Sequence, residues 1–509
     1  MYRKTLCLCL FCLMTAGLCF SQNVVKGVLL DSETNEPIIG ATIVNAATKV
    51  GDVSKLDGSF LLKVSQGNVV LDITYVGYTQ VSQKVTVSGS TTDLGTIYLK
   101  SDAIGLGDVT VTASMPWRIV DEAEKLRMTK AIACAIKSQA ALYKASKLYC
   151  GDQNYWKEAY DINQDCFNQL KQHGYELYTK MQTSNYNCAY AEYFVQNGSF
   201  STNPVDKETI WQSDFGEESM AYVWGTPLQG NYRCGTCPSQ NLVDAYDMLA
   251  TGKPIYHLDK PYLDDQGLQV NVDNTSGYNA SKPYSGRDPR MDATVLHDGS
   301  SIYLAGKKVA VQTFTGGNCE MQSGSTRYSE TGYYPFKGEY WNSGDGVAIQ
   351  DGRWKYYRLG EIYLNYAEAA AEVGTPESIQ KAMELVNTIR HRAGFDPSVD
   401  VSAPDKATAI LIVRHERQVE LAYEEHRYFD MRRWTSANED LTNEKFTVGM
   451  KITKKGLGRV YERFVINSKD GVTPTKLSYL AKWHFWPISA TEASTMESKT
   501  GDNWQNEGW

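Results

Sequence analysis

Carboxylate and imidazole side chains gather in one segment of the C-terminal third, and they are Glu416, Glu420, Glu424, His415 and His426. Side chains of these types on one helical face can bind a metal ion or exchange protons with a substrate. A zinc protease needs the pattern His-Glu-x-x-His, but the residue four positions after His415 is Val419. We therefore predict that this segment holds no metal and no catalytic residue.

The three glutamates are spaced four residues apart, so a helix places them on one face. Arg427 falls on nearly the same side. Buried carboxylates without partners are costly, and we expect their partners to be Arg417, Arg427 and Arg433. The sequence thus predicts a carboxylate–guanidinium network that fixes this helix against neighbouring helices. Its predicted members are Glu416, Glu420, Arg427, Asp430 and Arg433.

Seven of the 11 cysteines follow the N-terminal segment, namely Cys134, Cys150, Cys166, Cys188, Cys234, Cys237 and Cys319. An exported protein can form disulfides, but an odd number leaves at least one thiol free or paired elsewhere. Cys234-Gly-Thr-Cys237 has the spacing of a redox motif. It lies in a Gly/Pro/Asn-rich loop and opens no helix after a strand, as a thioredoxin-like site requires. We expect a small structural disulfide or two unpaired thiols there.

The sequence contains no other catalytic pattern: a G-x-S-x-G elbow, a Walker loop and paired Cys/His ligands are all missing. Acidic residues are plentiful, yet nothing marks one pair as the carboxylates of a glycosidase. The net charge of −8 argues against a nucleic-acid binder, which needs a basic surface. We predict a protein that is not an enzyme and uses no cofactor.

Residues 1–21 are typical of a signal peptide, with a basic start and an apolar run over residues 6–20 that is too short to span a membrane. Cys19 and Ser21 are small residues at positions −3 and −1, so we expect cleavage after Ser21. Lipidation of Cys19 is the alternative, although Leu18 fits a lipobox poorly. An exported protein follows from this interpretation.

Residues 23–100 are rich in Val, Thr, Gly and Ile with period-two stretches, which predicts a small β-sandwich. The domain resembles the carboxypeptidase-regulatory-like family. The matching segments are Lys26-Gly27-Val28, Pro37-Ile38-Ile39-Gly40-Ala41, Asp57-Gly58-Ser59-Phe60 and Tyr75-Val76-Gly77-Tyr78. That resemblance implies a transthyretin-like β-sandwich without catalytic residues, of the kind that commonly stands at the start of SusC-type TonB-dependent receptors.

Residues 101–116 are interpreted as a linker. Between Asp108 and Ala113, Val and Thr alternate, as in an extended segment that adds a strand to a partner's sheet. This segment resembles a TonB box, and an ordinary exit strand is an equally good interpretation. No plug and no long series of amphipathic strands follows, so the sequence does not predict a transporter.

Residues 117–509 change to a hydrophobic period of about 3.6, which predicts a mainly α-helical domain. The expected helices cover residues 120–149, 154–173, 354–373, 377–392 and 405–428. Four residues match the spacing of a tetratricopeptide-like helix pair, and they are Tyr356, Leu359, Gly360 and Tyr363. The glycine would let a neighbouring helix approach closely. Residues 175–350 are rich in Gly, Asn, Ser and Tyr, so we expect long irregular loops with a functional role.

This helical body resembles the SusD/RagB family through several segments in the family's order. They include Leu242-Val243-Asp244-Ala245-Tyr246-Asp247-Met248, Arg287-Asp288-Pro289-Arg290, Arg358-Leu359-Gly360-Glu361, Glu416-Arg417-Gln418-Val419-Glu420 and His426-Arg427-Tyr428-Phe429-Asp430. Because the ordered matches extend over most of residues 117–509, coincidence does not explain them.

The resemblance implies an outer-membrane protein that caps a SusC-type barrel and binds an oligosaccharide or peptide before TonB-driven import. Sugar binding in such proteins uses aromatic rings, because the C–H faces of pyranoses stack on them. The candidate ligand-binding residues are Trp211, Trp224, Tyr333, Tyr334, Tyr340 and Trp341. The competing interpretation is that these rings pack the irregular region onto the helices.

Two departures from the family pattern suggest a fusion. The usual lipidated cysteine and the N-terminal helical repeats are missing, and the opening of a SusC-like receptor takes their place. We hypothesise that an in-frame deletion or an assembly error joined the two, which long-read sequencing of the locus would test. A repeat array without its first units exposes an apolar face, so we expect lowered stability, and a cooperative melt at high temperature would contradict this.

The leading functional prediction is a nutrient-binding accessory of outer-membrane import. The alternatives are a non-catalytic interaction or scaffold protein that docks a partner such as TonB, and a partly non-functional fusion of receptor and binding protein. An exported glycoside hydrolase has little support in the sequence.

Overall fold

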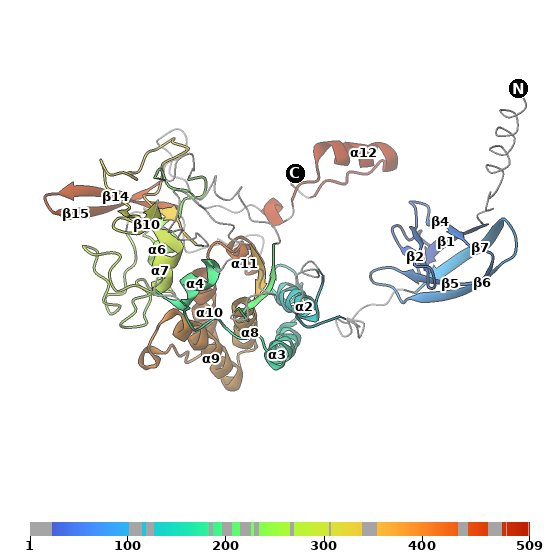
Figure 1. Cartoon of the computed structure of the whole chain (residues 1–509), viewed down its shortest axis with the longest axis horizontal. Coiled ribbons are helices and arrows are strands. Elements are labelled where there is room, and N and C mark those ends of the chain that lie inside the picture. Colours follow the sequence, from blue (N-terminus) through green and yellow to red (C-terminus); the bar gives the residue numbers. More distant parts are fainter. Residues whose placement is uncertain are drawn as a thin grey trace, which may run out of the picture. The chain divides into compact units, whose positions relative to one another are not determined.

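The structure is a computed structural model that describes residues 23–100, 115–118, 127–182, 187–195, 206–213, 225–228, 234–264, 269–304, 307–337, 354–435, 446–466, 481–484, 486–506 and 508–509. The chain divides into two compact units, residues 1–112 and 113–509 (Figure 1). The predicted signal peptide and the TonB-box-like segment lie outside the described residues.

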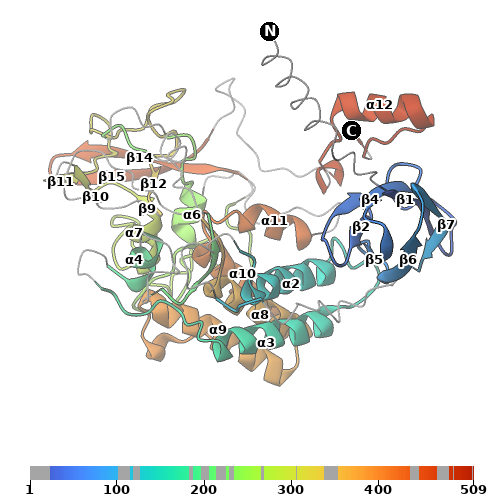
Figure 2. The same cartoon turned by 45° about the vertical axis from the view of Figure 1, so that its right-hand side comes forward.

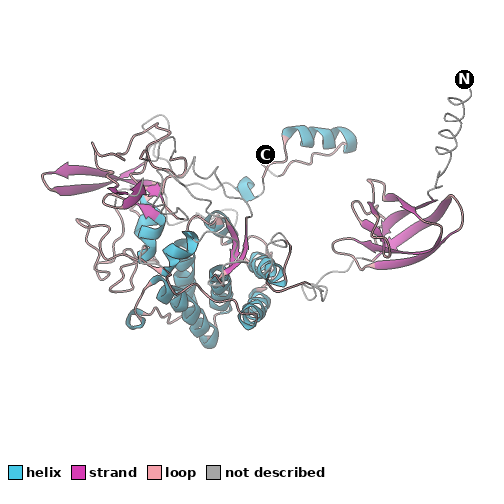
Figure 3. Ribbon diagram, in the orientation of Figure 1, coloured by secondary structure: helices cyan, strands magenta, loops and turns pink. Residues whose placement is uncertain are grey.

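The first unit is a sandwich of two β-sheets (Figure 3). In one sheet, β1 (Asn23–Asp31) lies between β4 (Ser59–Val64), to which it is antiparallel, and β7 (Thr91–Leu99), to which it is parallel. The other sheet has the order β3-β2-β5-β6, formed by Gly51–Val53, Thr42–Asn45, Gly67–Thr74 and Val81–Val87. Alternate side chains such as Val25 and Phe60 fill the core, and the predicted sandwich is confirmed.

The core of the second unit is helical, as predicted. Its main helices are α2 (Lys130–Ala145), α3 (Trp156–Gln172), α8 (Leu359–Val373), α9 (Pro376–Ala393), α10 (Lys406–Glu420) and α11 (His426–Arg433). Helix α8 is buried on all sides from its first residue to Ala371, as expected of a central helix. It packs against α2, α3, α9 and α10, and Figure 2 shows α2 and α3 beside it.

The ends of these helices carry the signals that the sequence needs to start and stop them. The side chains of Thr129, Thr375 and Asp405 accept hydrogen bonds from backbone N–H groups of the first turns of α2, α9 and α10. Gly374 and Gly394 end α8 and α9 in the left-handed conformation that glycine adopts without strain. Because Gly374 ends α8 and Thr375 caps α9, only a short turn separates these two helices.

Short elements make up most of the remaining described part of the second unit. They are α4 (Ala189–Val195), β8 (Thr209–Gln212), α6 (Gln240–Ala245), α7 (Pro289–Thr294), β9 (Val295–Leu296), β10 (Ser301–Leu304), β11 (Lys307–Ala310), β12 (Tyr334–Pro335), β13 (Lys355–Arg358), the hairpin β14 (Val448–Lys455) and β15 (Gly458–Val465), the 3-10 turns Pro397–Val399 and Ala481–His484, and α12 (Ala490–Thr500). No described helix is both long and apolar enough to cross a membrane.

The helix expected over residues 354–373 begins later than predicted. Its first residues form β13, which pairs with β8, so Tyr356 lies on a strand and the tetratricopeptide spacing does not lie on one helix. The neighbours of Gly360 are the side chains of Arg358 and Glu208, and not a neighbouring helix as expected. A side chain there would collide with the guanidinium of Arg358 and come within 3.0 Å of Glu208 Oε1.

The helix expected over residues 405–428 is broken into α10 and α11. Tyr423 and Glu425 adopt left-handed backbone conformations, with φ of 60° and 63°, which no α-helix can contain. Glu424 therefore lies in the turn and not on the helical face of Glu416 and Glu420. The regular spacing of the three glutamates concealed this break.

Candidate ligand-binding site

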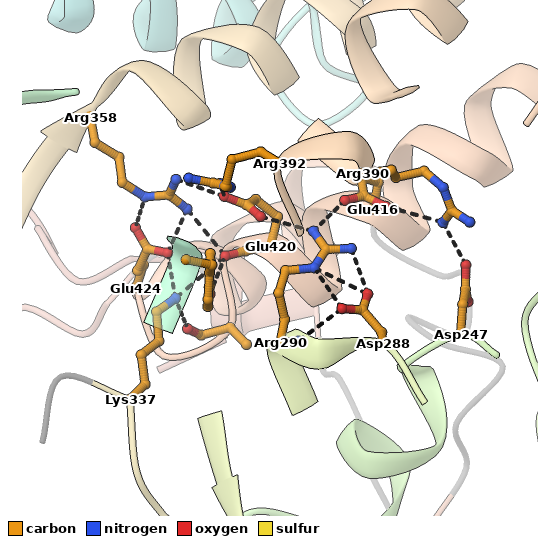
Figure 4. Close-up of polar contacts among 12 residues, drawn as sticks. Asp247, Asp288, Arg290, Lys337, Arg358, Arg390, Arg392, Glu416, Glu420 and Glu424 are labelled. Carbon is orange, nitrogen blue, oxygen red and sulfur yellow. Dashed lines mark hydrogen bonds and ion pairs between the residues drawn. The ribbon is translucent and has the colours of Figure 1, made fainter. Parts of the chain in front are cut away.

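A chain of buried charges connects the helices with the irregular part of the second unit (Figure 4). Glu420, the last residue of α10, lies at its centre and is fully buried. Its carboxylate accepts hydrogen bonds from Arg358 Nη1 at 2.7 Å, from Arg290 Nη1 at 2.8 Å and from Arg392 Nη2. One carboxylate thus joins three guanidinium groups that come from distant segments.

Further carboxylates neutralise the same arginines. Glu208, just before β8, accepts from Arg358 at 2.9 Å and from Arg392 at 3.0 Å. Glu424 accepts from Arg358 Nε at 2.6 Å and from Lys337 Nζ at 2.6 Å. The turn that breaks the helix therefore brings Glu424 back onto the network.

Arg290, in α7, is tied to two more carboxylates. Its Nη2 donates to Asp288 Oδ2 at 2.7 Å, and its Nη1 donates to Glu416 Oε1 at 2.5 Å. Asp288 also caps α7 through the N–H of Arg290. The network therefore fixes both the position and the start of this short helix.

The field of these cations overrides the cost of burial. Burial alone would raise the pKa of Glu424, but the charges of Arg358 and Lys337 lower it to about 2. The charges of Arg392, Arg358 and Arg290 lower the pKa of Glu420 below its usual range, despite its complete burial. Burial lowers the pKa of Lys337 to about 8, although Glu424 opposes that change. The carboxylates of Glu420 and Glu424 are therefore ionised and hydrogen-bonded, which suits a supporting role better than proton transfer.

A second group of charges holds α11 against α8. Arg433 Nη1 donates to Glu368 Oε1 at 2.5 Å, and Arg417 Nε donates to Asp430 Oδ2 at 2.9 Å. Trp434 Nε1 also donates to Glu368 Oε1, at 2.6 Å. All four charged groups are buried.

The pairing differs from the predicted one. Arg417 and Arg433 bind Asp430 and Glu368, whereas the partners of Glu416 and Glu420 are Arg290, Arg358 and Arg392. Arg427 is half-buried on α11. Sequence reasoning missed the three partner arginines because they lie up to 130 residues from the glutamates. The family-like segments that contain Arg290 and Arg358 were the signal available.

A pocket of about 340 Å³ opens beside this network, lined by Asp247, Arg390 and His415 among others. Its charged groups bind one another: Arg390 Nη1 donates to Asp247 Oδ2 at 2.6 Å, and His415 Nε2 lies 2.7 Å from Asp247 Oδ1. Among the described residues, no group of three or more His, Cys, Asp or Glu side chains has the arrangement of a metal site.

Three aromatic rings gather where β8 pairs with β13. The Trp211 ring lies 4.7 Å from that of Tyr356 and 6.3 Å from that of Tyr357, measured between centroids, and it is nearly parallel to Tyr357. Tyr356 is 44% exposed, while Trp211 and Tyr357 are half-buried. Tyr357 donates its hydroxyl hydrogen to Gln139 Oε1 on α2 at 2.7 Å. This aromatic cluster offers ring faces and edges together with polar atoms.

A β-bulge creates the cluster. Lys355 pairs with Gln212 and Tyr357 pairs with Trp211, so Tyr356 is an extra residue without a partner on β8. A bulge lets consecutive side chains leave the usual alternation. Tyr356 and Tyr357 therefore both contact Trp211, which a regular strand would not allow.

The buried network joins the ends of the two strands that carry this aromatic cluster. Arg358 ends β13 and Glu208 precedes β8, and their ion pair spans 2.9 Å. Glu420 and Glu424 hold the same guanidinium to the end of α10. The two strands thus have a rigid base, and the rings of the aromatic cluster are positioned by it.

The other predicted ligand-binding residues lie elsewhere. Tyr333 and Tyr334 are fully buried, so neither ring offers a face to a ligand in this structure. The Tyr333 hydroxyl contacts that of Tyr284 at 3.0 Å, and Tyr334 accepts a bond from Ser329 N at 3.1 Å. They follow the competing interpretation, in which the rings pack the irregular region. Trp224, Tyr340 and Trp341 lie outside the described residues.

Sequence reasoning missed a second group of exposed rings. Tyr428 and Phe429 on α11 lie 5.1 Å apart, and Trp486 is stacked with Tyr428 at 6.4 Å. Trp486 is 74% exposed. One face of Tyr428 is covered by the guanidinium of Arg432, 3.3 Å from the ring centroid. The exposed apolar side chains Tyr428 and Phe429 were hidden within a charged motif.

Comparison with known proteins covers both units. The SusD family model matches residues 153–509, and the CarboxypepD_reg-like domain matches residues 25–111. A solved SusD-like protein from Bacteroides fragilis is 23% identical, with 78% of this chain and 68% of that chain covered and a TM-score of 0.56. This likeness shows that the second unit has the same fold.

A second relative matches over a short stretch of the chain. The chain is also similar to the TonB-dependent receptor SusC of Bacteroides thetaiotaomicron, with 38% identity over 60 residues, which is 12% of this chain and 6% of that receptor. The similarity therefore concerns one small segment of the receptor. Because the SusD model matches more than half of the chain in its helical body, this protein belongs to the SusD family.

Proposed function

We propose that this protein binds a glycan nutrient on the aromatic cluster of Trp211, Tyr356 and Tyr357, at the outer membrane, and delivers it to a SusC-type barrel. The observation that carries the proposal is membership of the SusD family over residues 153–509. SusD-like proteins bind carbohydrate without catalysing a reaction and are associated with the outer membrane.

The aromatic cluster suits a sugar for physical reasons. A pyranose presents C–H groups on its faces and hydroxyls at its edge, and an aromatic ring with a polar tip can meet both. Tyr356 supplies the most exposed ring, and Trp211 supports it from the side at 4.7 Å. The rigid base under β13 limits the entropy that the rings would lose on binding.

Binding is tested by probing glycan and peptide arrays with the full chain, followed by calorimetry with the best ligand. We expect a glycan, and we expect Trp211→Ala to reduce its affinity by about tenfold, which corresponds to about 1.4 kcal/mol. A preference for peptides would contradict the ligand class. Unchanged glycan affinity in the variant would move the site elsewhere, to the predicted residues Trp224, Tyr340 and Trp341.

The partner is tested separately by a pull-down from native outer membranes. The expected partner is a TonB-dependent barrel of the SusC type, because the chain combines a SusD-like fold with a short similarity to SusC. Capture of no barrel would favour a scaffold function. Release of cleaved sugar from a bound glycan would contradict the proposal that the protein is not an enzyme.

A further inference from the structure

Two cysteines lie next to each other in the loop that precedes α6. The sulfur atoms of Cys234 and Cys237 are 2.6 Å apart. This separation is well inside ordinary van der Waals contact, and a disulfide bond of about 2.05 Å requires a further approach of only roughly half an ångström. The backbone has therefore already brought the two side chains into bonding position.

The surroundings of the pair are apolar and closely packed. Cys234 is 6% exposed and lies in a buried cluster with Leu296, Val311 and Tyr334, and Cys237 packs against it. The Cys234 sulfur also lies 4.0 Å from the carbonyl oxygen of Tyr333. Two thiols in such a place are poorly solvated, and a disulfide is the less polar form.

We propose that Cys234 and Cys237 form a disulfide that closes a small ring at the start of α6. The reaction needs an oxidant, and we assign this role to a disulfide donor of the oxidised-glutathione class. The Cys237 thiolate attacks one sulfur of the donor and releases the first donor thiol. The Cys234 thiol then loses its proton, attacks the Cys237 sulfur and releases the second donor thiol. Two electrons pass from the cysteines to the donor.

The two sulfur atoms differ in the way that this sequence of attacks requires. A hydrogen bond from Cys234 lowers the pKa of Cys237 to about 7, so Cys237 is the better first nucleophile near neutral pH. The same interaction, together with burial, raises the pKa of Cys234 above its usual range. Cys234 therefore reacts second, after the mixed disulfide has formed.

The ring would restrain a loop that contacts two other parts of the irregular region. Cys234 contacts Tyr333, the residue just before β12, and the Tyr333 hydroxyl donates to Gln240, the first residue of α6. Two residues after β12, Lys337 joins the buried network through Glu424. A closed loop at Cys234 would thus restrain the contacts of Tyr333 with Cys234 and Gln240.

The pairing can be mapped directly, because trypsin should release both cysteines in one peptide. Cleavage is expected after Arg233 and Arg287, while each lysine between them precedes a proline, so the peptide of residues 234–287 contains Cys234, Cys237 and no other cysteine. The full chain is equilibrated with oxidised glutathione, denatured without reductant, alkylated with N-ethylmaleimide and digested. We expect this peptide without any maleimide and lighter by two hydrogen atoms than the reduced form.

Every other mass contradicts the proposal. Two maleimide groups on this peptide would show that the thiols stay reduced. A stable glutathione adduct would show that Cys234 cannot reach Cys237. A cross-link to the peptide with Cys319, which lies in the same buried cluster, would give Cys234 a different partner. None of these outcomes depends on whether the protein binds a glycan.

A thermal melt supplies the second test. Reduction with dithiothreitol should lower the melting temperature of the oxidised protein by a few degrees, because the ring no longer restricts the unfolded chain. The Cys234→Ser/Cys237→Ser double variant should melt near the reduced protein and should not respond to dithiothreitol. Cys150→Ser is the matched control and should keep the full response. An unaltered response in the double variant would assign the stabilising disulfide to other cysteines.

Discussion

Strand β13 carries two regions of opposite character, the buried charge network and the exposed aromatic cluster. Arg358, at its end, is 1% exposed and binds three carboxylates, whereas Tyr356, two residues earlier, is 44% exposed. In the sequence the charged residues are the more obvious candidates for catalysis, yet in the structure they pair with one another and join β13 to its neighbours. The rings that face solvent are the ones available for recognition.

The difference between the two regions is also energetic. Removal of one partner from a buried ion pair leaves an uncompensated charge, which typically costs about 3–5 kcal/mol. An exposed side chain contributes little to stability, and its replacement usually changes the free energy of unfolding by less than about 0.5 kcal/mol. Stability and ligand affinity should therefore respond to different substitutions, although the residues are neighbours.

The largest effect is expected for Glu420→Ala. This change leaves Arg290, Arg358 and Arg392 without their common carboxylate, so the free energy of unfolding should fall by about 3–5 kcal/mol or more. Urea denaturation followed by circular dichroism measures it. Glu497→Ala, on the exposed face of α12, is the matched control and should stay within about 0.5 kcal/mol of the unchanged protein. Equal stability of both variants would refute the supporting role of the network.

Acidification should weaken the network next. The pKa of Glu424 is lowered to about 2 and that of Asp247 to about 2. Groups with a lowered pKa stabilise the fold above their unfolded value of about 4 and lose this contribution as the pH falls towards 2. The loss for Glu424 alone is of the order of 3 kcal/mol. Unfolding free energies measured from pH 6 to pH 2 should decrease, and Glu424→Gln should show a smaller decrease.

Tyr356→Ala should separate the two regions. Glycan affinity should fall by about tenfold, or about 1.4 kcal/mol, because the most exposed ring of the aromatic cluster is lost. The free energy of unfolding should change by less than about 0.5 kcal/mol. Calorimetric titration and urea denaturation of the same sample measure both. If stability fell as far as affinity, the ring would belong to the supporting structure and the comparison would fail.

The smallest effect is expected for Tyr428→Ala, the matched control for Tyr356. Its ring is 40% exposed, but Arg432 covers one face and Trp486 stacks with it. Neither glycan affinity nor unfolding free energy should change by more than about 0.5 kcal/mol. A tenfold loss of affinity would instead place the ligand on α11, and it would make exposure alone a poor guide to the site.

Local patterns predicted much of this molecule. Alternation of apolar residues identified the sandwich, because its two faces differ along every strand. The helices expected from residues 377 and 405 begin close to the starts of α9 and α10, which Thr375 and Asp405 cap. The acidic spacing predicted cationic partners for Glu420, and it has three, although they are not the predicted arginines.

The remaining features depend on contacts between distant segments. Glu424 continued the helical spacing, yet two left-handed residues beside it turn the chain back to Lys337. The sequence predicted both Tyr333 and Trp211 as ligand-binding residues. In the structure Tyr333 is fully buried, whereas Trp211 contacts the exposed Tyr356. The bulge at Tyr356 arises from pairing with β8, about 145 residues away along the chain. No local pattern carries that information.

Position 360 has no room for a side chain, so only glycine fits there without moving a neighbour. The space in which a methyl group would stand is occupied by the guanidinium of Arg358, with Glu208 behind it. An alanine there would push the arginine off its carboxylates and release β13 from its base. A residue without a side chain thus helps to hold β13, and the proposed aromatic cluster on it, in place.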